Sequence, residues 1–88
     1  MPPSLPSPDA ASRAARDALA ANLRLRRKAK HLTVTALAER AGVSRQAVHL
    51  ILGSGDARLD TLARLAWTLD AEPADLLRPP DAPTAPLP

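Results

Sequence analysis

The sequence predicts an all-α protein, and three of its features support this fold class. Alanine (19 residues) and leucine (15) dominate the 88 residues, and both favour helices. Valine, isoleucine and threonine, which favour strands, together number nine, and phenylalanine and tyrosine are absent. Between two proline-rich ends, apolar residues recur at intervals of three and four, which is the spacing of an amphipathic helix.

The first helix is predicted to begin after Ser7 or, one turn later, after Ser12, because serine caps helix N-termini well. It runs through an alanine-rich segment to Lys30. His31 is then expected in the turn, since histidine tolerates left-handed backbone geometry better than most residues.

Two short helices are expected next. The first covers residues 34–41, is capped by Thr33, and ends at Gly42, which suits a left-handed conformation. The second covers residues 45–52 and is capped by Ser44. Three residues that disfavour helix interiors are expected to terminate it: Gly53, Ser54 and Gly55.

Two further helices complete the prediction. An apolar stripe indicates a helix over residues 59–69, with Asp60 in the first turn, where the helix dipole favours a negative charge. Pro73 begins a last turn over residues 73–77, because a proline at the first helical position loses no hydrogen bond, and Pro79 stops it.

The ends of the chain carry nine of the ten prolines, so residues 1–11 and 79–88 are predicted to be disordered tails. Residues 12–78 then form one small domain, a size that buries only about 60% of its unfolded surface and benefits from a partner. The chain has no cysteine, no signal-peptide pattern and no apolar stretch of membrane-spanning length. We therefore expect a cytoplasmic protein with no cofactor, no metal and no membrane contact.

The two short helices and their turn carry the features of a helix-turn-helix. Ala38 is small where the second helix crosses the first closely, and Gly42 supplies the turn. Apolar residues are spaced to face one another across the angle between the helices: Leu37, Ala41, Val43, Val48 and Ile51. These features within 20 residues predict two helices that meet at a steep angle.

On these residues the chain resembles the lambda-repressor-like helix-turn-helix family, also called the Cro or xenobiotic-response-element type. The resemblance covers residues 17–77 and includes Leu19 and Asn22-Leu23-Arg24, the segment 59–66, and Ala74-Asp75-Leu76-Leu77. It implies a compact five-helix bundle with a central helix-turn-helix, and members of the family mostly bind operator DNA as dimers.

The resemblance also implies that one face of the second short helix enters the major groove. The residues assigned to base contacts are Ser44, Arg45, Gln46, His49 and Leu50. Their chemistry agrees, since Arg45 can bond guanine, Gln46 can pair with adenine, and Leu50 can touch a thymine methyl group. His49 is equally well explained as an exposed residue without a role.

The charge distribution favours contacts with the DNA backbone in the first half of the chain. Residues 13–45 carry nine basic and two acidic groups, a local charge of +7, whereas residues 46–88 carry −3. The candidate backbone contacts are Arg24, Arg27, Lys28, Thr33, Thr35, Ser54, Gly55 and Arg58. Such contacts fix the register of a protein on DNA without reading its sequence.

Three positions depart from the family pattern. Val34 stands where many members have a glutamine that contacts phosphate. Arg26 stands where the first helix usually has a core leucine, so either that helix is rotated toward Leu25 or the Arg26 stem lies along the bundle. Asp70 replaces the usual glycine at the end of the helix over residues 59–69.

Trp67, the one aromatic residue of the chain, is predicted to lie beside Ala63 on the polar side of its helix. One explanation is that the indole packs against the last helix or a tail. We favour a second, that Ala63 and Trp67 belong to a dimer or partner interface, where tryptophan is enriched.

The sequence therefore predicts a sequence-specific transcriptional regulator that binds double-stranded DNA, most plausibly a repressor that recognises an inverted repeat as a homodimer. One alternative is an antitoxin-like autoregulator that binds a toxin through the face of the last two helices. Another is a protein-interaction module that has kept the fold without operator binding, which Val34 favours. An enzyme is not expected, because Ser44 and His49 share one helix with no oxyanion site beside them.

Overall fold

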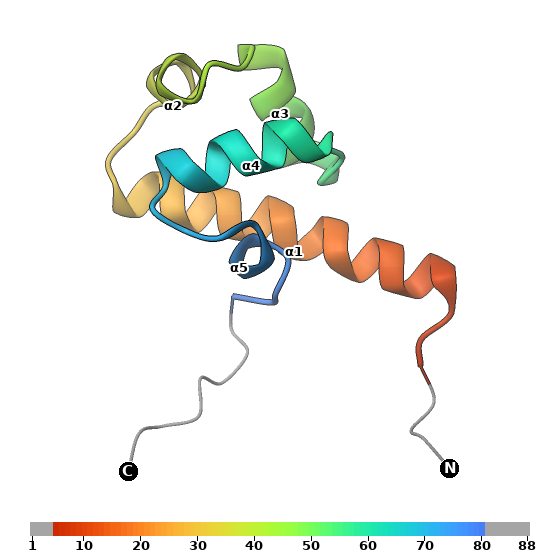
Figure 1. The fold of residues 1–88 in the computed structure, drawn as a ribbon. Coiled ribbons are helices and arrows are strands. Elements are labelled where there is room, and N and C mark those ends of the chain that lie inside the picture. The colour runs from red at the N-terminus through yellow and green to blue at the C-terminus, as the bar shows by residue number, and fades with distance from the viewer. Residues whose placement is uncertain (1–4, 81–88) are drawn as a thin grey trace, which may run out of the picture.

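The computed structural model describes residues 5–80, and this part of the chain forms five helices (Figure 1). They are α1 (Pro8–Ala29), α2 (Val34–Ala41), α3 (Arg45–Ser54), α4 (Leu59–Thr68) and α5 (Pro73–Leu76). No strand occurs among these residues. The all-α prediction and the order of the five helices are confirmed.

In the view of Figure 1, α2 and α3 lie above α4, and α1 and α5 lie below it. α1 contacts α3 and α5, and α4 contacts α2 and α5. The N-terminal half of α1 extends past the other helices (Figure 1). The helix-turn-helix formed by α2 and α3 is therefore held by α1 through α3 and by α4 through α2, while α5 contacts both α1 and α4.

The core draws apolar side chains from all five helices. Six large ones are fully buried: Leu23, Leu37, Val48, Ile51, Leu65 and Leu76. Four of the five residues predicted to join α2 to α3 are buried, and Val43 packs partly buried against them. Each fully buried leucine or isoleucine contributes about 1.5–3 kcal/mol through loss of contact with water, so the helix pair is held by its apolar interface.

The first helix begins earlier than the predicted tail boundary allows. The Ser7 hydroxyl accepts a hydrogen bond from the Ala10 backbone N–H at 3.2 Å, and Pro8 occupies the first turn. Residues 8–11, which were predicted to belong to a tail, are helical because a serine cap followed by proline is a favourable helix start. The remainder of the predicted tails lies outside the described residues at 1–4 and 81–88.

α3 ends later than predicted. Gly53 and Ser54 lie within the helix, and Gly55 caps it in the left-handed conformation with φ of 72°. The Gly55 N–H donates to the Ile51 carbonyl at 2.7 Å. Glycine tolerates helical and left-handed backbone alike, so its presence at position 53 did not determine the helix end.

Two turns use left-handed residues other than glycine. His31 has φ of 56°, which confirms its predicted place in the turn after α1. Asp70, in the turn after α4, also has φ of 56° and therefore takes the conformation that glycine adopts in other members of the resembled family. Its carboxylate forms an ion pair with Lys30, which links this turn to the C-terminal end of α1.

The exposure of Leu25 decides between the two explanations for Arg26. Leu25 remains 54% exposed, so α1 is not rotated to bury it. Arg26 is half-buried instead. A long arginine side chain can bury its aliphatic stem in this way while its charged end stays in water.

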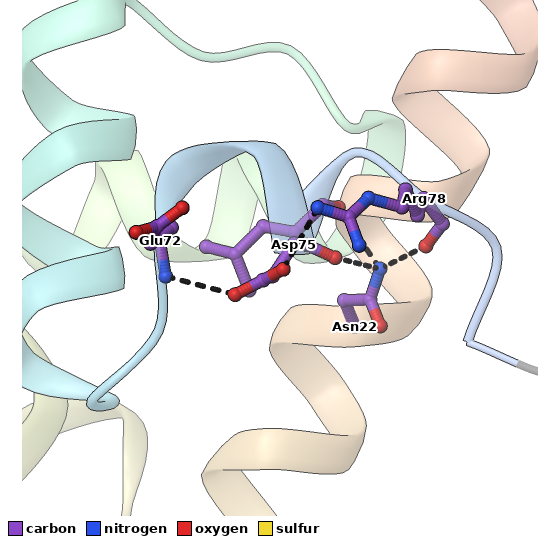
Figure 2. A network of polar contacts seen from close by, with 5 residues as sticks. Asn22, Glu72, Asp75 and Arg78 are labelled. Atoms are coloured by element: carbon purple, nitrogen blue, oxygen red, sulfur yellow. Dashed lines mark hydrogen bonds and ion pairs between the residues drawn. The ribbon is translucent and has the colours of Figure 1, made fainter. Parts of the chain in front are cut away.

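Asn22 ties the end of the described chain to α1. It is the buried polar residue of the core within residues 5–80. Its Nδ2 donates to the carbonyl oxygens of Leu76 at 3.0 Å and Arg78 at 2.5 Å, with Asp75 O farther away at 3.4 Å (Figure 2). An amide NH2 has two hydrogens, so the two shorter bonds use its full donor capacity.

The same network includes a carboxylate. Asp75 accepts a bond from the Glu72 backbone N–H at 3.1 Å and pairs with Arg78 Nη2 at 3.0 Å (Figure 2). α5 has only four residues, and these side-chain bonds hold it at both ends.

Candidate nucleic-acid interface

α2 and α3 are each defined by local caps. Thr33 Oγ1 accepts from the Ala36 N–H, and Ser44 Oγ accepts from the Ala47 N–H, both at 3.0 Å. Between the helices Gly42 has φ of 71°, and the Val43 N–H donates to the Ala38 carbonyl at 3.0 Å. This left-handed glycine closes α2 and turns the chain into α3, as the sequence predicts.

The outward face of α3 is polar and accessible. Val48 and Ile51 point into the core with no exposed surface, so the opposite side of the helix faces solvent. All five residues assigned to base contacts are exposed: Ser44, Arg45, Gln46, His49 and Leu50. Leu50 is 53% exposed, which leaves its apolar side chain available for a thymine methyl group.

The Ser44 hydroxyl can cap α3 and donate a hydrogen bond to DNA at the same time. Its hydroxyl oxygen accepts the α3 capping bond from Ala47. A hydroxyl also carries one hydrogen to donate, and that hydrogen is not used by the cap. A contact from Ser44 to DNA is therefore compatible with its structural role.

Several predicted backbone contacts are placed where a phosphate can reach them. Thr33 and Thr35 are exposed at the N-terminus of α2, where unpaired N–H groups attract anions. Lys28 is exposed in the last turn of α1. Arg58 precedes α4 with its side chain 86% exposed, and its Nε lies 3.4 Å from Asp60 Oδ1.

Arg24 and Arg27 each donate to a carbonyl oxygen of the domain, Arg24 from an exposed position and Arg27 from a half-buried one. Arg24 Nη2 donates to the Leu52 carbonyl at 3.1 Å, which ties α1 to the last turn of α3. Arg27 is half-buried, and its Nη1 donates to the Leu32 carbonyl at 2.9 Å. Both guanidinium groups therefore position the helix-turn-helix, and Arg27 is poorly placed for the DNA contact that the sequence suggests.

Gly55 was predicted to contact the DNA backbone, and the structure contradicts this prediction. It is buried, its N–H is used by the Ile51 carbonyl, and a Cβ placed on it would lie 2.0 Å from the Arg16 carbonyl oxygen. Gly55 therefore allows the α3–α4 loop to approach the backbone of α1 closely. The neighbouring Ser54 hydroxyl is also engaged, since it donates to the Leu50 carbonyl at 2.9 Å and accepts from the Asp56 N–H at 3.3 Å.

The sequence profile of the Cro/C1-type HTH DNA-binding domain matches residues 22–82. The chain belongs to this family. The match begins at Asn22 and includes the whole helix-turn-helix, so it supports a DNA-binding regulator. No curated protein and no solved structure gives a significant match to the chain.

The first 14 residues of α1 precede the part of this Cro/C1-type domain that the profile matches. They include the end of α1 that extends past the other helices in Figure 1, and also Ala18 and Leu19, which are buried in the core. Within the part of the chain that the structure describes, no helix combines the length and apolar character needed to cross a membrane.

The departure at Val34 has a structural explanation in this Cro/C1-type domain. Val34 is half-buried and packs against the core cluster. A valine at the start of α2 thus adds apolar contact in place of the polar side chain that contacts phosphate in many members. Backbone N–H groups and the two threonines remain as the polar groups at this end of α2.

Ala63 and Trp67 are both exposed on α4 of this Cro/C1-type domain, away from the α3 face. Trp67 is 76% exposed, so the indole is not covered by α5. The exposure that the sequence predicts for Trp67 is present, and its role in an interface stays a prediction. Sequence reasoning assigned no structural role to Asn22, whose signal was a polar residue on the apolar face of α1 between Leu19 and Leu23.

Proposed function

We propose that this Cro/C1-type domain is a sequence-specific transcriptional regulator that acts in the cytoplasm. In this proposal α3 lies in the major groove of double-stranded DNA, and Arg45 and Gln46 read base edges. Lys28, Thr33, Thr35 and Arg58 contact the sugar-phosphate backbone and fix the register. No catalytic step is involved.

The exposed face of α3 is the observation that carries the proposal. Arg45, Gln46, His49 and Leu50 combine hydrogen-bond donors, an acceptor and an apolar group on one side of a helix. The major groove presents the complementary set of acceptors, donors and thymine methyl groups. The same residues would be an unfavourable choice for a face that packs against protein, because their charged and polar groups would be desolvated.

Repression by occlusion is the regulatory mechanism that this small chain supports. A homodimer would place two α3 helices in successive major grooves of an inverted repeat, with half-sites about 34 Å apart. Bound in this way, the dimer would exclude polymerase from overlapping promoter DNA.

Selection of bound sequences from a random duplex pool tests sequence-specific recognition. We expect an enriched inverted repeat, and recovery of no motif at any salt concentration would contradict the proposal. For the enriched site, log affinity should fall linearly with log salt at a slope of about −0.9 per neutralised phosphate.

Replacing Arg45 with alanine is expected to cost about 1–3 kcal/mol on the selected site and to relax the preference at one base pair of each half-site. Lys28→Ala is the matched control, since it also removes an exposed cation but from a predicted phosphate contact. It should weaken binding to all sequences about equally and reduce the salt slope by about 1 per bound subunit. Equal effects of both variants on every probe would contradict the assigned roles.

A second candidate function is supported by the exposure of Trp67. In this alternative the domain also binds another protein, such as a toxin encoded beside it, through the α4 and α5 face. Tryptophan is enriched among residues that dominate protein interfaces, and an indole exposed to this extent is uncommon on a monomer.

A further inference from the structure

Trp67 stands between two open hollows on the surface of the domain. The first has a volume of about 420 Å³ and lies between α4 and the C-terminal end of α2, bordered by Arg40, Ala63 and Arg64. The second has a volume of about 840 Å³ and lies toward the turn before α5, bordered by Asp70, Glu72 and Asp75. The indole therefore forms an apolar ridge with a hollow on each side.

The two hollows carry opposite charge. Arg40 and Arg64 border the first hollow, where Glu39 is the one acidic neighbour. The second hollow is bordered by three carboxylates, and Arg40 lies at its edge. We refer to Arg40, Ala63, Arg64, Trp67 and Glu72 as the Trp67 surface.

Arg40 and Arg64 of the Trp67 surface are available to a partner, whereas the Glu72 side chain also takes part in the capping box of α5. Asp70 is paired with Lys30, and Asp75 with Arg78. No ion pair within residues 5–80 involves Arg40, Arg64 or Glu72. A partner that neutralises this surface must therefore offer a carboxylate to one hollow and a cation to the other.

We propose that the Trp67 surface binds a second copy of this chain across a two-fold axis that passes beside Trp67. In an isologous interface the same patch serves both subunits, so it must be complementary to itself. A two-fold rotation about the ridge brings the basic hollow of one subunit opposite the acidic hollow of the other. Arg64 then faces Glu72 of the second copy, and the two indoles shield one another from water.

This interface is compatible with DNA binding. The hollows are lined by residues of α2, α4, the turn after α4 and α5, and none of the α3 residues assigned to base contacts borders them. The inference rests on the proposed homodimer and specifies which surface forms it. It also accounts for an exposed aromatic residue on a domain whose core is small.

The single tryptophan makes self-association directly measurable. The chain has no tyrosine and no phenylalanine, so its aromatic fluorescence reports on Trp67 alone. We expect the red-shifted emission of a water-exposed indole at low concentration. As concentration rises, the emission should shift to shorter wavelength in parallel with a doubling of mass by sedimentation.

Trp67→Lys is expected to yield a monomer at concentrations where the wild-type chain is a dimer. Leu59→Lys is the matched control, because Leu59 is 83% exposed at the opposite end of the same helix. The Leu59→Lys variant should still sediment with the mass of a dimer. If Leu59→Lys abolishes the dimer and Trp67→Lys does not, the interface lies at the other end of α4 and the proposal is wrong.

Charge reversal tests the two-fold arrangement without removing the indole. Arg64→Glu and Glu72→Arg should each weaken dimerisation at least tenfold, and the double variant should recover most of that loss. Recovery requires the two positions to face each other across the interface. Additive weakening in the double variant would overturn the proposed geometry.

These measurements separate this inference from the proposed function. A chain that dimerises through Trp67 but selects no DNA sequence would support the interface and contradict sequence-specific regulation. A chain that selects a DNA sequence but remains a monomer would support sequence-specific recognition and contradict the interface. The same conclusion would follow if the Trp67→Lys variant still had the mass of a dimer. Capture of a different protein by Trp67, with no self-association at any concentration, would also overturn the proposal.

Discussion

Replacing Gly55 with alanine is expected to destabilise the protein by about 3 kcal/mol or more. The left-handed backbone at this position costs an L-residue about 1–2 kcal/mol. The added Cβ would lie 2.0 Å from the Arg16 carbonyl oxygen and 2.5 Å from its carbonyl carbon, and no side-chain movement relieves a contact between backbone atoms. α1 and the α3–α4 loop must then separate, at a packing cost of about 1–3 kcal/mol.

Thermal unfolding followed by circular dichroism measures this effect. A loss of 1 kcal/mol lowers the Tm of a domain this size by about 4–8 °C, so Gly55→Ala should lower it by more than about 12 °C. Total stabilities of natural domains are only about 5–15 kcal/mol. A fraction of the variant is therefore expected to be unfolded at physiological temperature.

Two other glycines provide matched controls. Gly42 has nearly the same φ, 71°, but the nearest atom to an added Cβ is Arg64 Nη1 at 3.1 Å, the end of a flexible side chain. Gly42→Ala should therefore cost only about 1–2 kcal/mol. Gly53 is helical with open space around it, so Gly53→Ala should stabilise by about 0.5–1 kcal/mol. Equal losses at positions 55 and 42 would show that the close approach to α1 is absent.

Replacing Asn22 with aspartate is expected to cost more than about 3 kcal/mol, although the two side chains have nearly the same shape. The substitution replaces a buried donor with a carboxylate oxygen that faces the carbonyl oxygens of Leu76 and Arg78. A buried carbonyl left without its donor costs about 1–3 kcal/mol, and a buried charge without a partner costs more. The segment after α5 should detach from α1 before the rest of the domain unfolds.

Two variants calibrate this expectation. Asn22→Ala removes the donor without adding charge and should cost about 1–3 kcal/mol. Arg78→Ala breaks the exposed ion pair with Asp75 but keeps the Arg78 carbonyl, so it should cost at most about 1 kcal/mol. Hydrogen exchange of the Leu76 and Leu77 amides reports detachment directly. Unchanged protection in Asn22→Asp would contradict the role assigned to the side chain.

Much of the exposed face of α3 could be predicted from the sequence because it depends on local rules. The Thr33 and Ser44 caps and the left-handed Gly42 each act within four residues along the chain. Once α3 begins at Arg45, helical periodicity alone places Val48 and Ile51 on one side and Arg45, Gln46, His49 and Leu50 on the other. The family match to residues 22–82 agrees with this local reading.

Two of the predicted backbone contacts, Arg27 and Gly55, are poorly accessible in the structure. An arginine in a basic run and a glycine after a recognition helix both suit a phosphate contact by residue type. In the folded chain Arg27 is half-buried against the Leu32 carbonyl, and Gly55 is pressed against Arg16. Residue type shows what a group can bind, whereas packing determines whether the group remains accessible.

The sequence by itself determined the helix order, the caps, the turn and the polar face of α3, because these follow from propensity and periodicity over a few residues. Tertiary structure decided the rest. Asn22 meets Leu76 across 54 positions of sequence, Gly55 meets Arg16 across the bundle, and Trp67 is left uncovered because α5 packs elsewhere on α1 and α4. Contacts between residues distant in sequence depend on how whole helices cross, and no local pattern encodes those distances.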